Sequence, residues 1–228
     1  MHGRHSAFRR KIKRIMNWPV MVGSLLNYQT VQNVSISFSM RHKYETRGIV
    51  LARSPLGEAN AYVTVLTPEL GLVRARAQGV RRSGAKLAAS LATFAESSLV
   101  LVRGKEGWRV AGAVLETNWL TRIERAAARA AAARVSGLLV RLVAGEVHDP
   151  ALFAITTGFF GALATLPEDS YEAAEALAAL RVLAVLGLDA GEIPGEAAAF
   201  TPEVLAPVRA ARAEYVARIN HGIAASGL

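Results

Sequence analysis

The 228-residue chain contains no cysteine. That absence excludes a disulfide framework, a thiolate zinc site, an iron–sulfur cluster and a cysteine nucleophile. A membrane span needs roughly 18 consecutive apolar residues. The richest stretch, residues 150–167, is interrupted by Thr156, Thr157 and Gly158. We therefore expect a folded cytoplasmic protein that does not enter a membrane.

Motifs that bind phosphates or activate a nucleophile are also missing. The sequence has no Walker-type phosphate loop, no GxGxxG after a strand and no GxSxG elbow. His148 and His221 lack a second ligand at a suitable spacing on one helix face. Glu58 and Glu69 fall in predicted turns, where carboxylates are usually solvated. We expect no catalytic residue, no metal and no cofactor, and hence a protein that is not an enzyme.

The formal charge of +9 is unevenly distributed. Residues 1–43 contain eight Lys or Arg and no acidic residue, residues 44–120 contain ten against six, and residues 121–228 contain nine against twelve. A basic front half therefore precedes a mildly acidic rear half. This asymmetry favours a polyanionic partner for the front half.

Residues 1–39 form a basic extension without the pattern of a domain. Residues 9–14 include five Lys or Arg, and no steady hydrophobic period follows them. A secretory signal is disfavoured, because residues 17–19 (Asn-Trp-Pro) interrupt its apolar core. We expect this segment to be disordered or to precede the true start at Met40. A basic arm that grips nucleic acid is the alternative.

The next part of the chain has the period of β-strands. Five β-rich runs cover residues 44–53, 61–67, 71–80, 97–103 and 108–116, with Gly and Pro turn signals between them. Residues 86–91, between the third and fourth runs, are compatible with a short helix. This is the element order of an OB-fold, a Greek-key barrel that often binds single strands. We predict such a domain over residues 40–118, although other small β-barrels share the pattern.

The rear half is rich in alanine and leucine. Apolar residues at helical spacing predict an amphipathic helix over residues 121–144. Start signals at Asp149, Asp169 and Thr201 predict further helices over residues 150–166, 169–186 and 202–224. The predicted fold is therefore α+β, a five-stranded barrel followed by an all-α bundle over residues 119–228. A Gly, Pro and Ala-rich loop, residues 188–200, joins two of its helices.

The third β-rich run and the loop after it carry the clearest binding signal. Alternation places Arg74, Arg76 and Gln78 on one face, and the loop adds three further cations. Such a stripe neutralises phosphates and binds nucleic acid without reading its sequence. A solvated barrel face is the alternative. Together with three cations of the last hairpin, the predicted nucleic-acid-binding residues are Arg74, Arg76, Arg81, Arg82, Lys86, Arg103, Lys105 and Arg109.

Two aromatic residues are candidates for base stacking. Tyr62 and Trp108 lie at the starts of predicted strands, beside the basic stripe. Binders of single strands combine a basic groove with rings of this kind. Ordinary packing at a barrel rim is the alternative for both rings.

Six short segments follow one another in a recognisable order. They are HKY at 42–44, TRGIVL at 46–51, GEAN at 57–60, TPELG at 67–71, AQGVR at 77–81 and LVRGK at 101–105. Together they resemble the amino-terminal domain of the RecO family of DNA repair proteins, over about residues 42–118. The rear half is similar in helical texture only. Its segment LRVLAVLGL at 180–188 resembles the one that precedes the family's cysteine-bearing zinc loop.

The resemblance implies an OB-fold followed by a helical bundle. It also implies a recombination mediator that binds single- and double-stranded DNA and anneals complementary strands. Such a mediator works with RecR to load a recombinase onto DNA coated by single-strand-binding protein. The implied DNA-binding residues fall on the stripe from Arg74 to Lys86, which the charge pattern also selects. An OB-fold RNA-binding module and a protein-interaction adaptor are the alternative functions.

The loop over residues 188–200 departs from the family pattern, because it has no cysteine and so no zinc module. The resemblance nevertheless implies a site for the acidic tail of single-strand-binding protein. We expect that tail to bind an apolar groove edged by Arg141 or Arg181. The alternative for Arg181 is an ion pair with Glu175 or Glu192.

Overall fold

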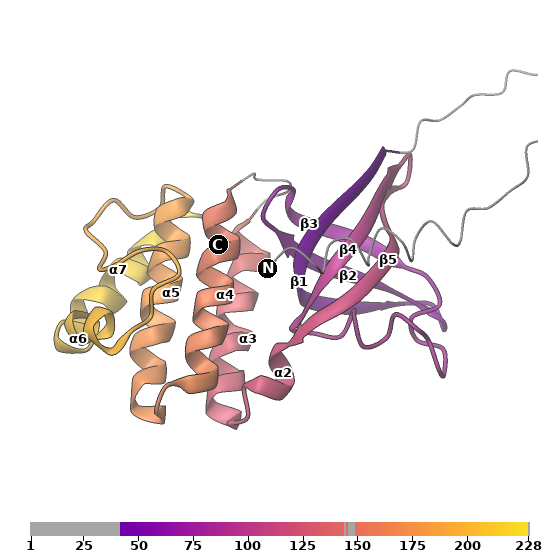
Figure 1. Cartoon of the computed structure of the whole chain (residues 1–228). Coiled ribbons are helices and arrows are strands. Elements are labelled where there is room, and N and C mark those ends of the chain that lie inside the picture. The colour runs from indigo at the N-terminus through magenta and orange to yellow at the C-terminus, as the bar shows by residue number, and fades with distance from the viewer. Residues whose placement is uncertain (1–41, 144, 146–148, 228) are drawn as a thin grey trace, which may run out of the picture. The chain divides into compact units, whose positions relative to one another are not determined.

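The computed structural model describes residues 42–143, 145 and 149–227. The predicted basic extension, residues 1–39, lies outside the described residues. The front half of the described chain is made of strands (Figure 1). They are β1 (His42–Leu56), β2 (Asn60–Thr67), β3 (Gly71–Ala77), β4 (Ala95–Gly104) and β5 (Gly107–Asn118).

These strands close into a barrel in the order β1-β2-β3-β5-β4. Strand β1 is long enough to pair with β4 through its first half and with β2 through its second half. A register shift between Val50 and Ala52 separates the two halves and bends the strand. Strands β3 and β5 close the barrel through a short parallel contact, at Ala75–Trp108 and Arg76–Arg109. The predicted five-stranded barrel is confirmed.

Alternate residues of the strands fill the barrel. Val63, Val73 and Ala75 are each almost completely buried, while their sequence neighbours are at least partly exposed. The segment between β3 and β4 is a series of turns, so the short helix expected over residues 86–91 is wrong. Its backbone hydrogen bonds join residues either three or four positions apart, so no regular helix forms. The turns place the Leu91 side chain in the barrel core.

Seven short or medium helical segments follow β5 in the described residues. They are α2 (Trp119–Arg122), α3 (Ala126–Leu142), α4 (Pro150–Thr165), the 3₁₀ turn η1 (Glu168–Ser170), α5 (Tyr171–Val185), α6 (Pro202–Ala210) and α7 (Arg212–Ala225). Asp149 caps α4 as expected, because its Oδ1 accepts a hydrogen bond of 2.8 Å from the Ala151 N–H. Within the described part of the chain, no helix combines the length and apolar character needed to cross a membrane.

Three helix boundaries differ from expectation. The helix predicted over residues 121–144 is divided, because Ile123 leaves helical geometry and is fully buried between α2 and α3. The last predicted helix is divided at Ala211. Asp169 lies inside η1 and does not cap α5, whose N-cap position is Ser170. In each case the boundary differs by a few residues, and the helical character of the region is as predicted.

Besides the cluster inside the barrel, a second hydrophobic cluster spans the junction between the barrel and the helices. Residues of the barrel, including Ile49 and Leu66, belong to the same buried cluster as residues of α3, α4 and α5. Phe94, which precedes β4 with a left-handed backbone (φ 64°), packs its ring edge-on against Phe160 of α4 at 5.1 Å. A division into two domains at residues 118 and 119 stays a prediction, because apolar contacts continue across it.

A buried carboxylate lies at the same junction. Glu96 of β4 is 3% exposed and accepts a 2.9 Å hydrogen bond from Trp119 Nε1 of α2. Its other oxygen pairs with Arg47 of β1, whose guanidinium also lies 5.7 Å from the centre of the Phe153 ring of α4. Burying a charge is favourable only where hydrogen bonds and an opposite charge compensate for lost water. Here the hydrogen bond comes from Trp119 of α2 on the helical side of the junction, and the opposite charge comes from Arg47 of β1 on the barrel side.

Candidate nucleic-acid interface

The candidate interface is centred on the outer face of β3. Pairing of three strands places Tyr62 of β2, Arg76 of β3 and Arg109 of β5 in one row across the barrel. Arg74 lies on the same face of β3, two residues before Arg76. The barrel thus brings together side chains from three separate stretches of sequence.

A groove of about 540 Å³ opens beside this row. Strands β2 and β3 form one side, and the turn between β4 and β5 forms the other. Its polar and aromatic lining consists of Tyr62, Arg76, Gln78, Lys105, Glu106, Trp108 and Arg109. Five of the residues predicted from the sequence therefore line one groove. The strand 2–3 face and the loop between strands 4 and 5 are the surfaces with which OB-folds bind oligonucleotides.

The cations of the groove have no carboxylate partner in the described part of the chain. Arg76, Lys105 and Arg109 form no ion pair there, and the Arg76 Nε atom is shielded from solvent without a hydrogen-bond partner. Arg74 likewise has no ion pair with any described residue, and its guanidinium lies 4.3 Å from the centre of the Tyr62 ring. Glu106 supplies the one carboxylate among the residues that line the groove.

Arginines of the helical half have the opposite environment. Four of the nine arginines of residues 121–228 are paired with carboxylates: Arg134 with Glu175, Arg209 with Asp169, Arg212 with Glu172 and Arg218 with Asp189. The hydrogen bonds that these guanidinium groups donate to their carboxylate partners raise the pKa of Arg134, Arg212 and Arg218. The positive charge available for an external anion is therefore concentrated on the barrel.

The loop after β3 contributes fewer side chains to the groove than its positive charge suggests. The Arg81 guanidinium donates a 2.6 Å hydrogen bond to the Gly57 carbonyl, which fastens this loop to the β1–β2 turn. Arg82 and Lys86 are exposed and unpaired in the described residues, yet they do not line the groove. Arg103 is exposed on β4, with its guanidinium 5.4 Å from the centre of the Trp108 ring. None of these four residues lines the groove.

The two stacking candidates differ in accessibility. Trp108 is only 9% exposed and belongs to the barrel core, where its ring meets Tyr44 edge-on at 5.1 Å. In this conformation it packs as a core residue and offers the groove one edge. Tyr62 is half-buried beneath Arg74. A stacking role stays a prediction, and Tyr62 is the residue that suits it.

Arg181 is not at the edge of a groove. It is 4% exposed, and its guanidinium donates hydrogen bonds to the carbonyls of Pro194 (2.7 Å), Ala197 (3.0 Å) and Ala199 (2.7 Å). Burial lowers its pKa to about 10. The expectation that Arg181 receives a partner's tail is therefore corrected, because a side chain with this burial is a structural contact of the loop. It pairs with neither Glu175 nor Glu192.

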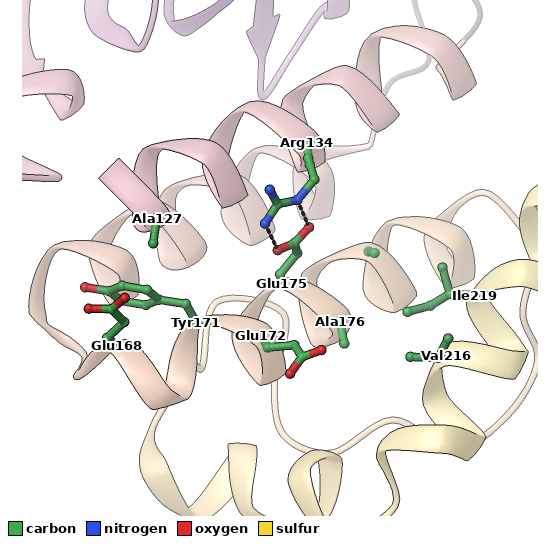
Figure 2. Close-up of a pocket in the computed structure, with 10 residues that line it drawn as sticks. Ala127, Arg134, Glu168, Tyr171, Glu172, Glu175, Ala176, Val216 and Ile219 are labelled. Atoms are coloured by element: carbon green, nitrogen blue, oxygen red, sulfur yellow. Dashed lines mark hydrogen bonds and ion pairs between the residues drawn. The ribbon is translucent and has the colours of Figure 1, made fainter. Parts of the chain in front are cut away.

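Arg141 is exposed near the end of α3 and makes no ion pair in the described residues. The helical half has a separate cavity of about 570 Å³ between α3, α5 and α7, shown in Figure 2. Neither Arg141 nor Arg181 lines it. A tail-binding role for Arg141 stays a prediction.

The loop over residues 188–200 does not fit a zinc module. It has no cysteine. Over residues 42–143 and 149–227, no group of three histidine, aspartate or glutamate side chains is arranged to hold a metal ion. Asp189 is engaged with Arg218 through hydrogen bonds of 2.6 and 3.1 Å, and three carbonyls of the loop are engaged with Arg181.

Comparison with known proteins gives one consistent match to the barrel. The family described as "Recombination protein O N terminal" matches residues 40–114. A DNA repair protein RecO from Dehalococcoides mccartyi strain 195 is 32% identical over 114 residues, which are 50% of this chain and 45% of the relative. The RecO of Synechococcus elongatus is 37% identical over 117 residues, 51% of this chain and 44% of the relative.

A third relative, the RecO of Synechococcus sp. strain JA-2-3B'a(2-13), is 39% identical over 104 residues, 45% of this chain and 35% of the relative. The matched segments thus span less than half of the length of each of these relatives. The similarity covers the barrel and the groove. It does not extend through the whole helical half.

Proposed function

We propose that the chain is a DNA-binding mediator of recombinational repair, on the premise that its barrel is similar to the amino-terminal domains of the RecO family. In this proposal the groove on β2, β3 and the β4–β5 turn binds the phosphate backbone of DNA. Binding depends on charge and shape and is independent of sequence. The protein performs no chemistry on the DNA.

One observation carries the proposal: the cations that line the groove lack carboxylate partners. Arg76 and Arg109 have none in the described residues, whereas Arg47 elsewhere on the barrel and helical arginines such as Arg212 and Arg218 have one. Unpaired guanidinium groups beside a groove favour a polyanion, because phosphates replace the water and counterions that otherwise neutralise them.

The groove also suits an unstacked base. Arg74 lies on the Tyr62 ring and can move to a phosphate, which leaves the ring for a base. Arg76 and Arg109 then hold the adjoining phosphates. Weak, reversible backbone binding of this kind brings two complementary strands together and leaves their base edges accessible, so it supports annealing.

In the wider pathway, the protein works with RecR and helps to load a recombinase onto DNA coated by single-strand-binding protein. These roles rest on the family of the barrel. The acidic tail of single-strand-binding protein and its proposed contact at Arg141 belong to the same proposal.

The test is fluorescence anisotropy of a labelled single-stranded oligonucleotide with the full chain, titrated at several salt concentrations. Replacing Arg76 and Arg109 together by glutamate should weaken binding at low salt by about one to two orders of magnitude. Each lost phosphate contact should also reduce the slope of log K against log salt by about 0.7. An annealing assay in the same buffer should slow in parallel. An RNA of the same sequence serves as a competitor and separates this proposal from an RNA-binding module.

The matched control replaces Arg122 and Arg125 by glutamate. Both are exposed on the helical half and unpaired in the described chain, and the double change alters net charge by the same amount. We expect it to leave the salt slope nearly unchanged. If the two double variants behaved alike, binding would reflect net charge and the groove would not be the site.

A further inference from the structure

The cavity between α3, α5 and α7 forms a trough whose bottom and sides are apolar. We call it the helical trough. Ala176 and Ala179 of α5 form its floor. Ala127 of α3 lies on one side of Ala176, and Val216 and Ile219 of α7 lie on the other (Figure 2). Val216 is 37% exposed, which is unusual for a residue of its size in this chain.

Small side chains on the floor decide what shape the trough accepts. Alanines let another backbone approach closely, and both α3 and α7 pack against α5 on either side. This is the arrangement of helices around an open position for one more helix. An amphipathic helix would place apolar side chains against Val216, Ile219 and Ala176.

The charges on the edge decide which helix fits. Three carboxylates line the trough, those of Glu168, Glu172 and Glu175, against the single cation Arg134. Arg134 is fully engaged, because its guanidinium donates two hydrogen bonds, of 2.5 and 2.6 Å, to Glu175 (Figure 2). Glu172 has Arg212 as its partner, and Glu168 has no ion pair in the described part of the chain.

We propose that the helical trough binds a cationic amphipathic helix of a partner protein, with its apolar side chains on α5 and α7 and its lysines or arginines beside Glu168 and Glu172. An acidic segment is disfavoured there, because its carboxylates would face Glu168, which has no ion pair in the described residues, and the only nearby cations of Glu172 and Glu175, Arg212 and Arg134, are already engaged. This proposal is independent of DNA binding by the barrel.

The test uses two designed helical probes and the full chain. Each probe is a labelled peptide of about 18 residues, long enough to form a helix on its own. Both have the same leucine face, but one has lysine and the other glutamate on its polar face. Anisotropy titrations should show binding of the lysine peptide. Val216→Ser should weaken it by about fivefold through lost apolar contact. Glu168→Gln should weaken it about twofold and reduce its salt dependence.

Two control variants test the place of binding. Val114→Ser changes a valine on strand β5 that is 52% exposed and does not line the trough, and Glu203→Gln removes an exposed carboxylate of α6. Both should bind the lysine peptide as the unaltered protein does. Ala176→Gln should fill the floor and abolish binding while the oligonucleotide still binds the barrel. The proposal is overturned if the lysine peptide does not bind, if Val216→Ser and Ala176→Gln have no effect, or if these changes weaken binding of the glutamate peptide instead.

Discussion

Replacing Arg181 by methionine should destabilise the protein through the loop over residues 188–200. Methionine keeps much of the volume of the side chain and removes its charge and donors. The guanidinium donates to three carbonyls, at 2.7, 2.7 and 3.0 Å, and lies 4.7 Å from the centre of the Phe200 ring. Among the described residues no backbone N–H donates to these carbonyls, so the substitution leaves them unpaired or hydrated.

The size of the effect follows from those contacts. Leaving a carbonyl without its donor costs roughly 1 kcal/mol when water can partly replace the bond, and up to about 3 kcal/mol when it cannot. Three such bonds give about 3 kcal/mol as a conservative sum. The desolvation of the guanidinium, seen in a pKa lowered to about 10, is relieved by the change and keeps the expected loss at that lower end. Such a loss is a large fraction of the roughly 5–15 kcal/mol typical of domains.

Urea unfolding followed by circular dichroism measures this loss by linear extrapolation. Limited proteolysis should locate it, with faster cleavage between residues 188 and 200. The control is Arg212→Met, which removes an exposed pair with Glu172 whose side chains are 62% and 66% exposed, and should leave the free energy of unfolding nearly unchanged. An Arg181→Met variant no less stable than this control, with the loop cleaved no faster, would refute the role assigned to the buried guanidinium.

Two further changes test other contacts. Hydrogen bonds from Arg218 lower the pKa of Asp189, so this pair stabilises the fold above the ordinary pKa of aspartate and the contribution disappears as pH falls through the lowered value. Asp189→Asn should therefore reduce stability by about 1 kcal/mol at pH 7, with the difference vanishing below about pH 4 in urea titrations; a difference independent of pH would contradict this. Glu96→Ala should cost about 2–3 kcal/mol, because Trp119 Nε1 loses its buried acceptor and Arg47 its partner. A double-mutant cycle with Trp119→Phe should give a coupling energy of about 1 kcal/mol, and additive effects would argue against a direct hydrogen bond between Trp119 and Glu96.

Local patterns in the sequence were sufficient to predict whether most elements are strands or helices. Alternation of apolar and polar residues predicted the five strands, because side chains on a strand alternate between core and solvent whatever the partner strand. The N-cap of α4 at Asp149 could also be predicted, because it depends only on residues next to it in the sequence. The turns between β3 and β4 were not, because Leu91 enters the barrel and tertiary packing overrode a weak helical tendency.

The candidate site shows the same division. Composition and spacing identified the basic residues of β3, because alternation along a strand is enough to place Arg74 and Arg76 on one face. The sequence did not indicate which of the other cations join them. That depends on the β3–β5 contact, which pairs Arg76 with Arg109, two residues 33 positions apart that no local pattern connects.

The sequence by itself determined the cysteine-free composition, the basic front half and the order of strands and helices, because each follows from residue types and short-range periodicity. Only the tertiary structure decided which charges are available. Arg81 is tied to the Gly57 carbonyl, Arg181 is buried on three carbonyls of its own loop, and Arg109 stands unpaired beside a groove among the described residues. An arginine's role depends on the carbonyls and carboxylates that the fold brings within hydrogen-bond distance, and residues far apart in the chain supply them.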